Sequence, residues 1–208
     1  MRREEFRAGP LAGTVALACV LWFIAFALGG VSFWIKISLS AATLAALALF
    51  LQPETRGALR LDRRAVALGL GSAAGLYLIF WLGRSVSMLL FDFAGGQIGA
   101  IYQKGAGTPP EVVALLLFFV TGPCEEIYWR GYLQRSLMAR FGRGAGWILA
   151  TAIYAGVHVS SMNFMLVGAA AVAGAFWGAM YARLGSLPPV IVSHSVWSAV
   201  IFALLPMR

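Results

Sequence analysis

The stretch VVALLLFFVTGPCEEIYWRGYLQRSL, residues 112–137, joins a long apolar run to a cluster of charges. Thirteen uncharged residues, Val112 to Cys124, lead directly into Glu125 and Glu126, and Arg130 follows four residues after the second glutamate. The apolar run predicts a helix inside a protein core or a membrane. Charged groups at that depth are costly, so they are expected to have partners or a function.

The composition of the whole chain places that helix in a membrane. Of the 208 residues, 61% are hydrophobic and only 12% are charged, whereas soluble domains have about 25% charged residues. Uncharged runs close to the length of about 20 residues that crosses a bilayer are Leu11–Ile35, Ile37–Pro53, Ala65–Gly83 and Val159–Ala182. The sequence therefore predicts an all-α fold, a polytopic transmembrane bundle of about seven to eight helices.

The predicted spans form one domain. They are residues 11–33, 35–52, 65–91, 111–141, 145–160, 163–182 and 187–206. Within the fourth span, Gly122-Pro123 predicts either one kinked helix or a short segment followed by a second helix that starts near Pro123. We expect a single integral membrane domain over residues 1–208, with N-terminal spans in 1–100 and a core in 110–206. Residues 92–110 are glycine-rich and predict an outer loop, and Gly174 and Gly178 form a GxxxG motif that favours close helix packing.

A net charge of +8 is large enough for a nucleic-acid-binding protein, but the positions of the basic residues argue against nucleic-acid binding. The basic residues occupy short connections between apolar runs, which is the pattern that orients membrane proteins. Three basic residues, Lys36, Lys104 and Arg208, fall on one side, and eleven fall on the other: Arg2, Arg3, Arg7, Arg56, Arg60, Arg63, Arg64, Arg135, Arg140, Arg143 and Arg183. We expect a multi-pass bacterial protein of the cell (inner) membrane, in contact with the lipid bilayer and without a nucleic-acid partner. Its first span is too long for a signal peptide, and its N-terminus is expected in the cytoplasm.

Few charged groups and histidines are expected at membrane depth. They are Arg84, Glu125, Glu126, Arg130, His158 and His194. Glu126 and Arg130 stand at i and i+4, so they share a helix face and can form an ion pair. Glu125 is rotated from Glu126 by about 100°, so it is not expected to pair with Arg130. It is expected to point into a polar cavity.

Both histidines of the chain fall inside apolar segments. Tyr154 precedes His158 by four residues in YAGVH, and Ser198 follows His194 by four residues in HSVWS. Each histidine is therefore expected to have a hydroxyl partner on the same helix face. A Glu–His pair in an apolar pocket can bind and deprotonate a water, and a second histidine with a hydroxyl can stabilise an oxyanion. This combination predicts hydrolysis of a peptide bond inside a membrane.

These motifs resemble those of the CPBP family of intramembrane proteases, which includes the prenyl-protein (CAAX) endopeptidases and the bacterial Abi proteins. EEIYWR, residues 125–130, is similar to the EExxxR motif of that family. YAGVH takes the place of FxxxH, with Tyr154 for the phenylalanine, and HSVWS takes the place of HxxxN, with Ser198 for the usual Asn or Asp. The resemblance covers roughly residues 110–206, whereas the first 100 residues resemble the family only in being apolar spans.

The resemblance implies a role for each matching residue. Glu125 would activate a water together with His158, and His194 would form the oxyanion site with Ser198 in the place of the asparagine. Glu126 and Arg130 would support the structure of the site. A serine is shorter than an asparagine and offers one donor instead of two, so this oxyanion site is expected to be weaker, to use another donor, or to be adapted to a different substrate. The implied partner is a membrane-anchored protein or peptide substrate.

Other functions and chemistries stay open. Chains of Glu and His also act as proton relays, so a proton-coupled transporter is one alternative, although no internal repeat of the transporter kind is visible. A non-catalytic membrane immunity or scaffold protein is another, because Ser198 departs from the family pattern. Glu125, His158 and His194 could hold zinc with an open position, but no HExxH motif is present, and a mechanism without a cofactor is favoured. Cys124 as a nucleophile is disfavoured, because buried thiols are usually inert.

Overall fold

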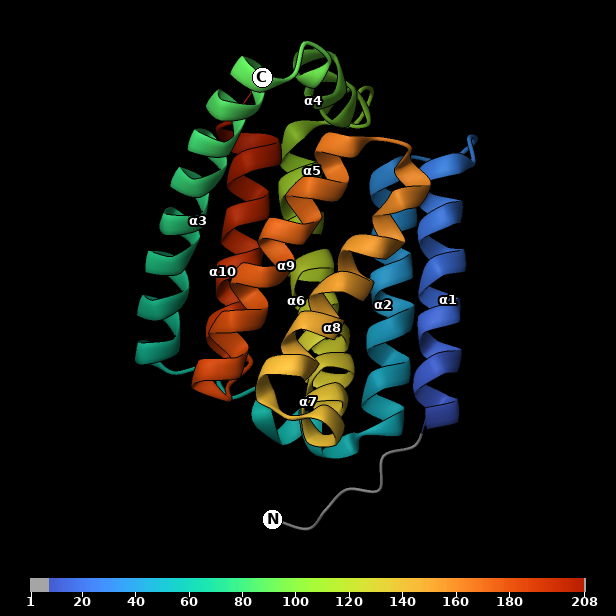
Figure 1. The fold of residues 1–208 in the computed structure, drawn as a ribbon, viewed down its shortest axis with the longest axis vertical. Coiled ribbons are helices and arrows are strands. Elements are labelled where there is room, and N and C mark those ends of the chain that lie inside the picture. Colours follow the sequence, from blue (N-terminus) through green and yellow to red (C-terminus); the bar gives the residue numbers. More distant parts are fainter. Residues whose placement is uncertain (1–7, 208) are drawn as a thin grey trace.

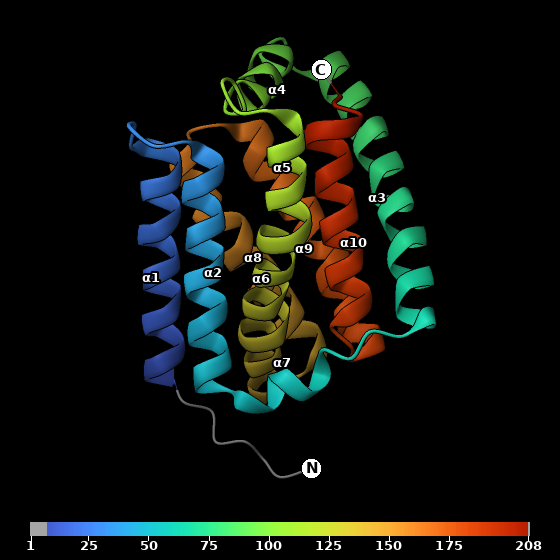
Figure 2. The same ribbon diagram turned by 180° about the vertical axis from the view of Figure 1, so that it is seen from behind.

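A computed structural model describes residues 8–207, which fold into helices without a strand. Arg2, Arg3, Arg7 and Arg208, which contribute to the predicted charge bias, lie outside these described residues. Within these described residues, continuous runs that contain α-helix number eight, in the range expected. Figures 1 and 2 show most of them running side by side along one common axis, with the short helix α4 across one end.

In the part of the chain that the structure describes, five helices are long and apolar enough to cross a membrane. They are α1 (Ala8–Ala27), α2 (Phe33–Leu51), α3 (Arg63–Leu90), the continuous segment Pro110–Phe141, and α9 (Phe164–Leu184). The helices α8 (Arg143–Val157) and Pro188–Leu204, which begins with α10 (Pro188–Ala199), are shorter. Large apolar side chains remain exposed around the bundle, among them Leu89, Phe50 and Phe119. That surface suits a lipid environment, so the predicted multi-pass helical fold is confirmed.

The glycine-rich connection 92–110 contains a helix that the sequence analysis did not predict, α4 (Ala94–Gln103). Its glycines lower helix propensity, so the helix depends on tertiary contacts. The Gln97 carbonyl accepts a hydrogen bond from Asn163 Nδ2 at 2.8 Å, and Gln97 Oε1 accepts one from the Met165 backbone N–H at 2.9 Å. These bonds attach α4 to the start of α9.

The fourth span is one helix that runs through Gly122-Pro123. It consists of α5 (Pro110–Leu116), a π segment (Leu117–Thr121), α6 (Gly122–Glu126), a second π segment (Ile127–Gln134) and α7 (Arg135–Phe141). Pro123 has no N–H to donate, and the Gly122 N–H bonds the carbonyl of Leu117, five residues back. The helix therefore widens locally instead of breaking, and the two glutamates lie between two π segments. Such segments are frequent at functional sites.

Gly122 allows this central helix to approach α10 closely. A Cβ at Gly122 would lie 2.7 Å from Ser195 Oγ and 2.9 Å from Ser195 Cα. No side chain fits in that space without moving one of the two helices. The approach brings the start of α6 against the middle of α10, where His194 lies.

The GxxxG motif of α9 packs as the sequence predicts. A Cβ at Gly174 would lie 2.9 Å from the Tyr154 ring, and one at Gly178 would lie 2.7 Å from the Trp147 ring. The same two glycines also accept hydrogen bonds through their carbonyls, from Arg130 at 3.4 Å and from Gln134 at 2.8 Å respectively. Side chains one turn apart on the central helix thus bind carbonyls one turn apart on α9.

Candidate active site

A cavity of about 440 Å³ lies among the helices. Four residues singled out from the sequence, Glu125, His158, His194 and Ser198, all line it. They come from α6, the 3-10 turn that follows α8, and α10. The structure therefore brings the three separate sequence motifs to one place.

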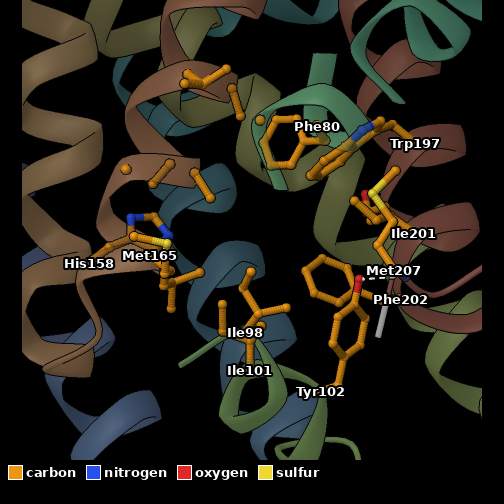
Figure 3. A pocket seen from close by; sticks show the side chains of 18 of the residues that line it. Phe80, Ile98, Ile101, Tyr102, His158, Met165, Trp197, Ile201, Phe202 and Met207 are labelled. Carbon is orange, nitrogen blue, oxygen red and sulfur yellow. Dashed lines mark hydrogen bonds between the residues drawn. The ribbon is translucent and has the colours of Figure 1, made fainter. Parts of the chain in front are cut away.

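The walls of the cavity are mainly apolar, which corrects the expectation that Glu125 points into a polar cavity. Figure 3 shows His158 and Met165 on one side, with Phe80, Trp197, Ile201 and Phe202 across from them. Polar side chains are a minority of the lining, and besides the glutamate, the histidines and Ser198 they include Arg84, Ser87 and Lys104. Aromatic and aliphatic side chains from α1, α2, α3, α4 and α9 make up most of the remaining wall.

Glu126 and Arg130 form the ion pair that their spacing predicts. Glu126 Oε1 lies 2.8 Å from Arg130 Nη1, and both side chains are buried. The guanidinium also lies over the rings of Tyr154 and Trp177, 4.8 and 5.6 Å from their centroids. Stacking of this kind stabilises a buried cation, so Arg130 is held from three directions.

The same carboxylate oxygen contacts His194, which the sequence analysis did not predict. His194 Nδ1 lies 2.6 Å from Glu126 Oε1. One face of the imidazole stacks on Trp177, with centroids 3.9 Å apart and planes 16° apart, and the Trp177 indole N–H in turn donates to Ser193 Oγ at 3.1 Å. The orientation of His194 is therefore fixed at one edge and one face, and Nε2 is the ring nitrogen left for other partners. Trp177 carried no signal in the sequence beyond its apolar setting.

Glu125 is bound by a hydroxyl from another helix. Tyr154 Oη donates to Glu125 Oε2 at 3.0 Å, and the carboxylate is 6% exposed. Gly174 leaves room for the Tyr154 ring, which lies between Arg130 and His158. The phenol is long enough to reach across to α6, so its hydroxyl serves the glutamate and not the histidine of its own motif.

The expectation that each histidine has a hydroxyl partner one turn away is therefore wrong for both motifs. His158 Nδ1 lies 2.8 Å from the backbone carbonyl of Tyr154, not from its hydroxyl. Ser198 Oγ donates to the backbone carbonyl of His194. A serine in a helix commonly bonds the carbonyl four residues back, because its short side chain reaches that oxygen more easily than a neighbouring side chain.

A residue from the N-terminal spans also contacts the site. The Trp22 indole N–H, on α1, donates to His158 Nε2 at 3.3 Å. Phe26, one turn further along α1, lies with its ring centroid 5.9 Å from that of His158. From the sequence, residues 1–100 are predicted only as apolar spans, and a tryptophan within such a run gives no indication of this contact.

The arrangement does not fit a metal ion. Within residues 8–207, no group of three or more His, Cys, Asp or Glu side chains lies close enough to hold one. His158 presents its two nitrogens to Trp22 and to a carbonyl, and His194 presents Nδ1 to Glu126. The three residues considered as zinc ligands from the sequence, Glu125, His158 and His194, thus line one cavity without forming a coordination shell.

Comparison with known protein families gives a match over part of the chain. Residues 108–200 match the family described as Type II CAAX prenyl endopeptidase Rce1-like. No curated protein and no solved structure matches the chain. The matched segment contains all three motifs, whereas α1 to α4 precede it. The resemblance identified from the sequence is thereby confirmed over residues 108–200, where the chain is similar to the Rce1-like type II CAAX prenyl endopeptidase family.

Proposed function

We propose that this protein is an intramembrane endopeptidase that hydrolyses a peptide bond of a membrane-anchored protein or peptide, using a water activated by Glu125 and His158. The observation that carries the proposal is the placement of the buried Glu125 carboxylate in one apolar cavity with both histidines of the chain. The family match supports a protease acting on a protein or peptide in the membrane.

In the proposed reaction, Glu125 holds the attacking water. Tyr154 occupies Oε2, so Oε1 is the oxygen assigned to the water. The water gives one proton to the Glu125–His158 pair, and its oxygen forms a bond to the carbonyl carbon of the substrate. Collapse of the tetrahedral intermediate breaks the C–N bond, and the leaving amine takes up the proton. The products are a carboxylic acid and an amine, so one water is consumed.

His194 is assigned to the oxyanion. Its Nδ1 faces the Glu126 carboxylate, which accepts a hydrogen bond, so Nδ1 carries a proton. With a second proton on Nε2, the ring is an imidazolium that can donate to the developing negative charge. The Glu126 carboxylate stabilises that cation and fixes its orientation, as an acidic partner does for the histidine of a catalytic triad. Preorganised donors of this kind act most strongly where water is excluded.

Ser198 has a smaller role in this proposal than the family pattern implies. Its hydroxyl donates to the His194 carbonyl, so it supports α10 and does not add a donor to the oxyanion site. His194 then carries that function without the second side chain expected from the motif. A weaker oxyanion site is the consequence.

The mechanism assigns no step to a metal. We expect cleavage by the purified protein to survive treatment with a strong zinc chelator, at the rate of an untreated sample. Loss of activity that is restored by added zinc, but not by magnesium, would assign Glu125, His158 and His194 to a metal in a rearranged site.

The apolar walls fit a substrate that is itself embedded in lipid. The proposed setting is the cell membrane, with the N-terminus in the cytoplasm as the arginine bias favours. Fluorescence of a reporter fused to either terminus of the chain, with protease protection of right-side-out and inverted vesicles, would determine the orientation.

The decisive test of the function compares strains that carry the wild-type chain, Glu125→Gln and Glu111→Gln. Both substitutions remove one carboxylate from the same long helix, but Glu111 is exposed at its start and far along the chain from the site. Mass spectrometry of protein termini in membrane and secreted fractions should show a set of termini that disappears only in Glu125→Gln. Identical termini in all three strains, at equal protein levels, would refute the protease and favour a scaffold or transporter.

A further inference from the structure

The contact between Trp22 and His158 joins a helix outside the matched family region to a residue of the proposed site. The Trp22 side chain is fully buried, and its Nε1 lies 3.3 Å from His158 Nε2. Trp22 and Phe26 stand at i and i+4, so they share one face of α1, and the rings of both contact the imidazole. The helix α1 therefore forms the wall behind His158.

The direction of this hydrogen bond fixes the protonation pattern of the imidazole. An indole N–H is a donor only, so His158 Nε2 must be the acceptor and bears the lone pair. The proton of the neutral ring then lies on Nδ1, where it is donated to the Tyr154 carbonyl at 2.8 Å. Both ring nitrogens are thus engaged by fixed partners from two different helices.

This arrangement has a consequence for the proposed reaction. The lone pair of Nε2 is the group with which His158 would accept a proton from water, and it is directed at Trp22. His158 lines the cavity, whereas Trp22 does not, so the lone pair is directed into the wall of the cavity. The indole N–H and the attacking water therefore compete for the same nitrogen.

We propose that Trp22 is a positioning residue for His158: its indole N–H holds the imidazole in the Nδ1–H tautomer and occupies Nε2 until a water takes its place. The N-terminal spans are then part of the active site. The importance of this contact for cleavage rests on the proposed protease function, but the contact itself is testable without any substrate.

The test uses Trp22→Phe, which removes the N–H and keeps an aromatic ring. Trp129→Phe is the matched control, because Trp129 is also buried, packs edge-to-face on Trp22 at 5.6 Å, and has an Nε1 without a hydrogen-bond partner. Both variants lose the same atoms from the same cluster. Only the first loses a hydrogen bond to His158.

The first readout is the ¹⁵N spectrum of protein labelled at histidine and kept in lipid nanodiscs. The chain has two histidines, and His194→Gln assigns their signals. We expect the wild type to show His158 as the Nδ1–H tautomer, with its Nε2 signal moving downfield in Trp22→Phe and staying in place in Trp129→Phe. An Nε2–H tautomer in the wild type, or equal shifts in both variants, would overturn the proposal.

The second readout is modification by diethyl pyrocarbonate, which acylates a neutral imidazole at a free lone pair. Release of one ordinary hydrogen bond should raise the modification rate of His158 about two- to tenfold in Trp22→Phe, with the rate in Trp129→Phe unchanged. Peptide mass spectrometry separates His158 from His194. Equal rates in the three proteins would refute the competition for Nε2. Neither readout needs turnover, so both can be repeated in a Glu125→Gln background. The contact between Trp22 and His158 is therefore tested separately from the proposed protease function.

Discussion

Glu126 and His194, 68 positions apart in the chain, meet with Oε1 and Nδ1 at 2.6 Å. The same oxygen binds Arg130 at 2.8 Å, so one buried carboxylate connects the ion pair of the central helix to the histidine of α10. The second glutamate of the motif is therefore a link between two helices as well as a partner of the arginine. Its effect on a reaction would pass through His194.

We predict that Glu126→Gln lowers kcat by about 10²-fold with little change in KM, because the His194 cation loses the charge that stabilises it. This factor is at the low end of the loss measured when one oxyanion donor is removed. A fluorogenic peptide assay in nanodiscs measures both constants. A rise in KM at constant kcat would instead place Glu126 in substrate binding.

Arg130→Met should lower the free energy of unfolding by about 3–5 kcal/mol, because it leaves the buried Glu126 carboxylate without its cation. Arg135→Gln is the control. Arg135 Nη2 lies 3.9 Å from Glu54 Oε1, with the two side chains 32% and 47% exposed, and pairs in contact with solvent contribute about 0–1 kcal/mol. Urea unfolding in mixed micelles, followed by tryptophan fluorescence, compares the two. Equal midpoints would show that the stacking of Arg130 on Tyr154 and Trp177 was dispensable and that the carboxylate finds another partner.

Tyr154→Phe removes the hydroxyl that binds Glu125 and keeps the ring that packs on His158 and Arg130. We expect kcat to fall about tenfold or more, since hydrogen bonds to charged groups contribute about 1.5–3 kcal/mol. Tyr77→Phe also loses a hydroxyl, but that group donates to the Leu205 carbonyl outside the cavity, so its kcat should equal that of the wild type. Equal activity of all three proteins would mean that Glu125 does not need Tyr154.

Gly122→Ala should destabilise the protein by about 1–3 kcal/mol, the usual cost of overpacking, because the new Cβ would meet Ser195 Oγ at 2.7 Å. It should also lower activity, since α6 and α10 must separate and carry Glu126 away from His194. Gly71→Ala on α3 is the control, because nothing lies within 4 Å of its added Cβ. That variant is expected to be as stable as the wild type or more stable. Full activity of Gly122→Ala would show that the helices accommodate the methyl group without moving.

Patterns of charge and spacing predicted much of this protein. The four long uncharged runs predicted helices that are long and apolar enough to span, because about 20 apolar residues in a helix match the thickness of a bilayer. The i and i+4 spacing predicted the bond between Glu126 and Arg130, since both partners lie on one helix. The resemblance to the CPBP motifs implied that Glu125, His158 and His194 act together, and all three line one cavity.

Contacts between helices were predicted poorly. Three contacts of the site join residues on different helices. They are Tyr154 with Glu125, His194 with Glu126, and Trp22 with His158. Helical spacing says which side chains share a face, but it does not say which face meets which neighbour. A similar limit applies to α4, whose glycines mask a helix held by Asn163 and Met165.

The paired bonds from Arg130 and Gln134 to the carbonyls of Gly174 and Gly178 restrict how this sequence can change in evolution. The two hydrogen bonds are spaced by one turn on both helices, so together they fix the register of the central helix against α9. Insertion of a single residue between Arg130 and Gln134 would rotate one side chain by about 100° relative to the other. An insertion in the turn at Gly142 would leave both hydrogen bonds in place. Homologous chains should therefore vary in length at such turns and keep a constant length from Glu125 to Gln134.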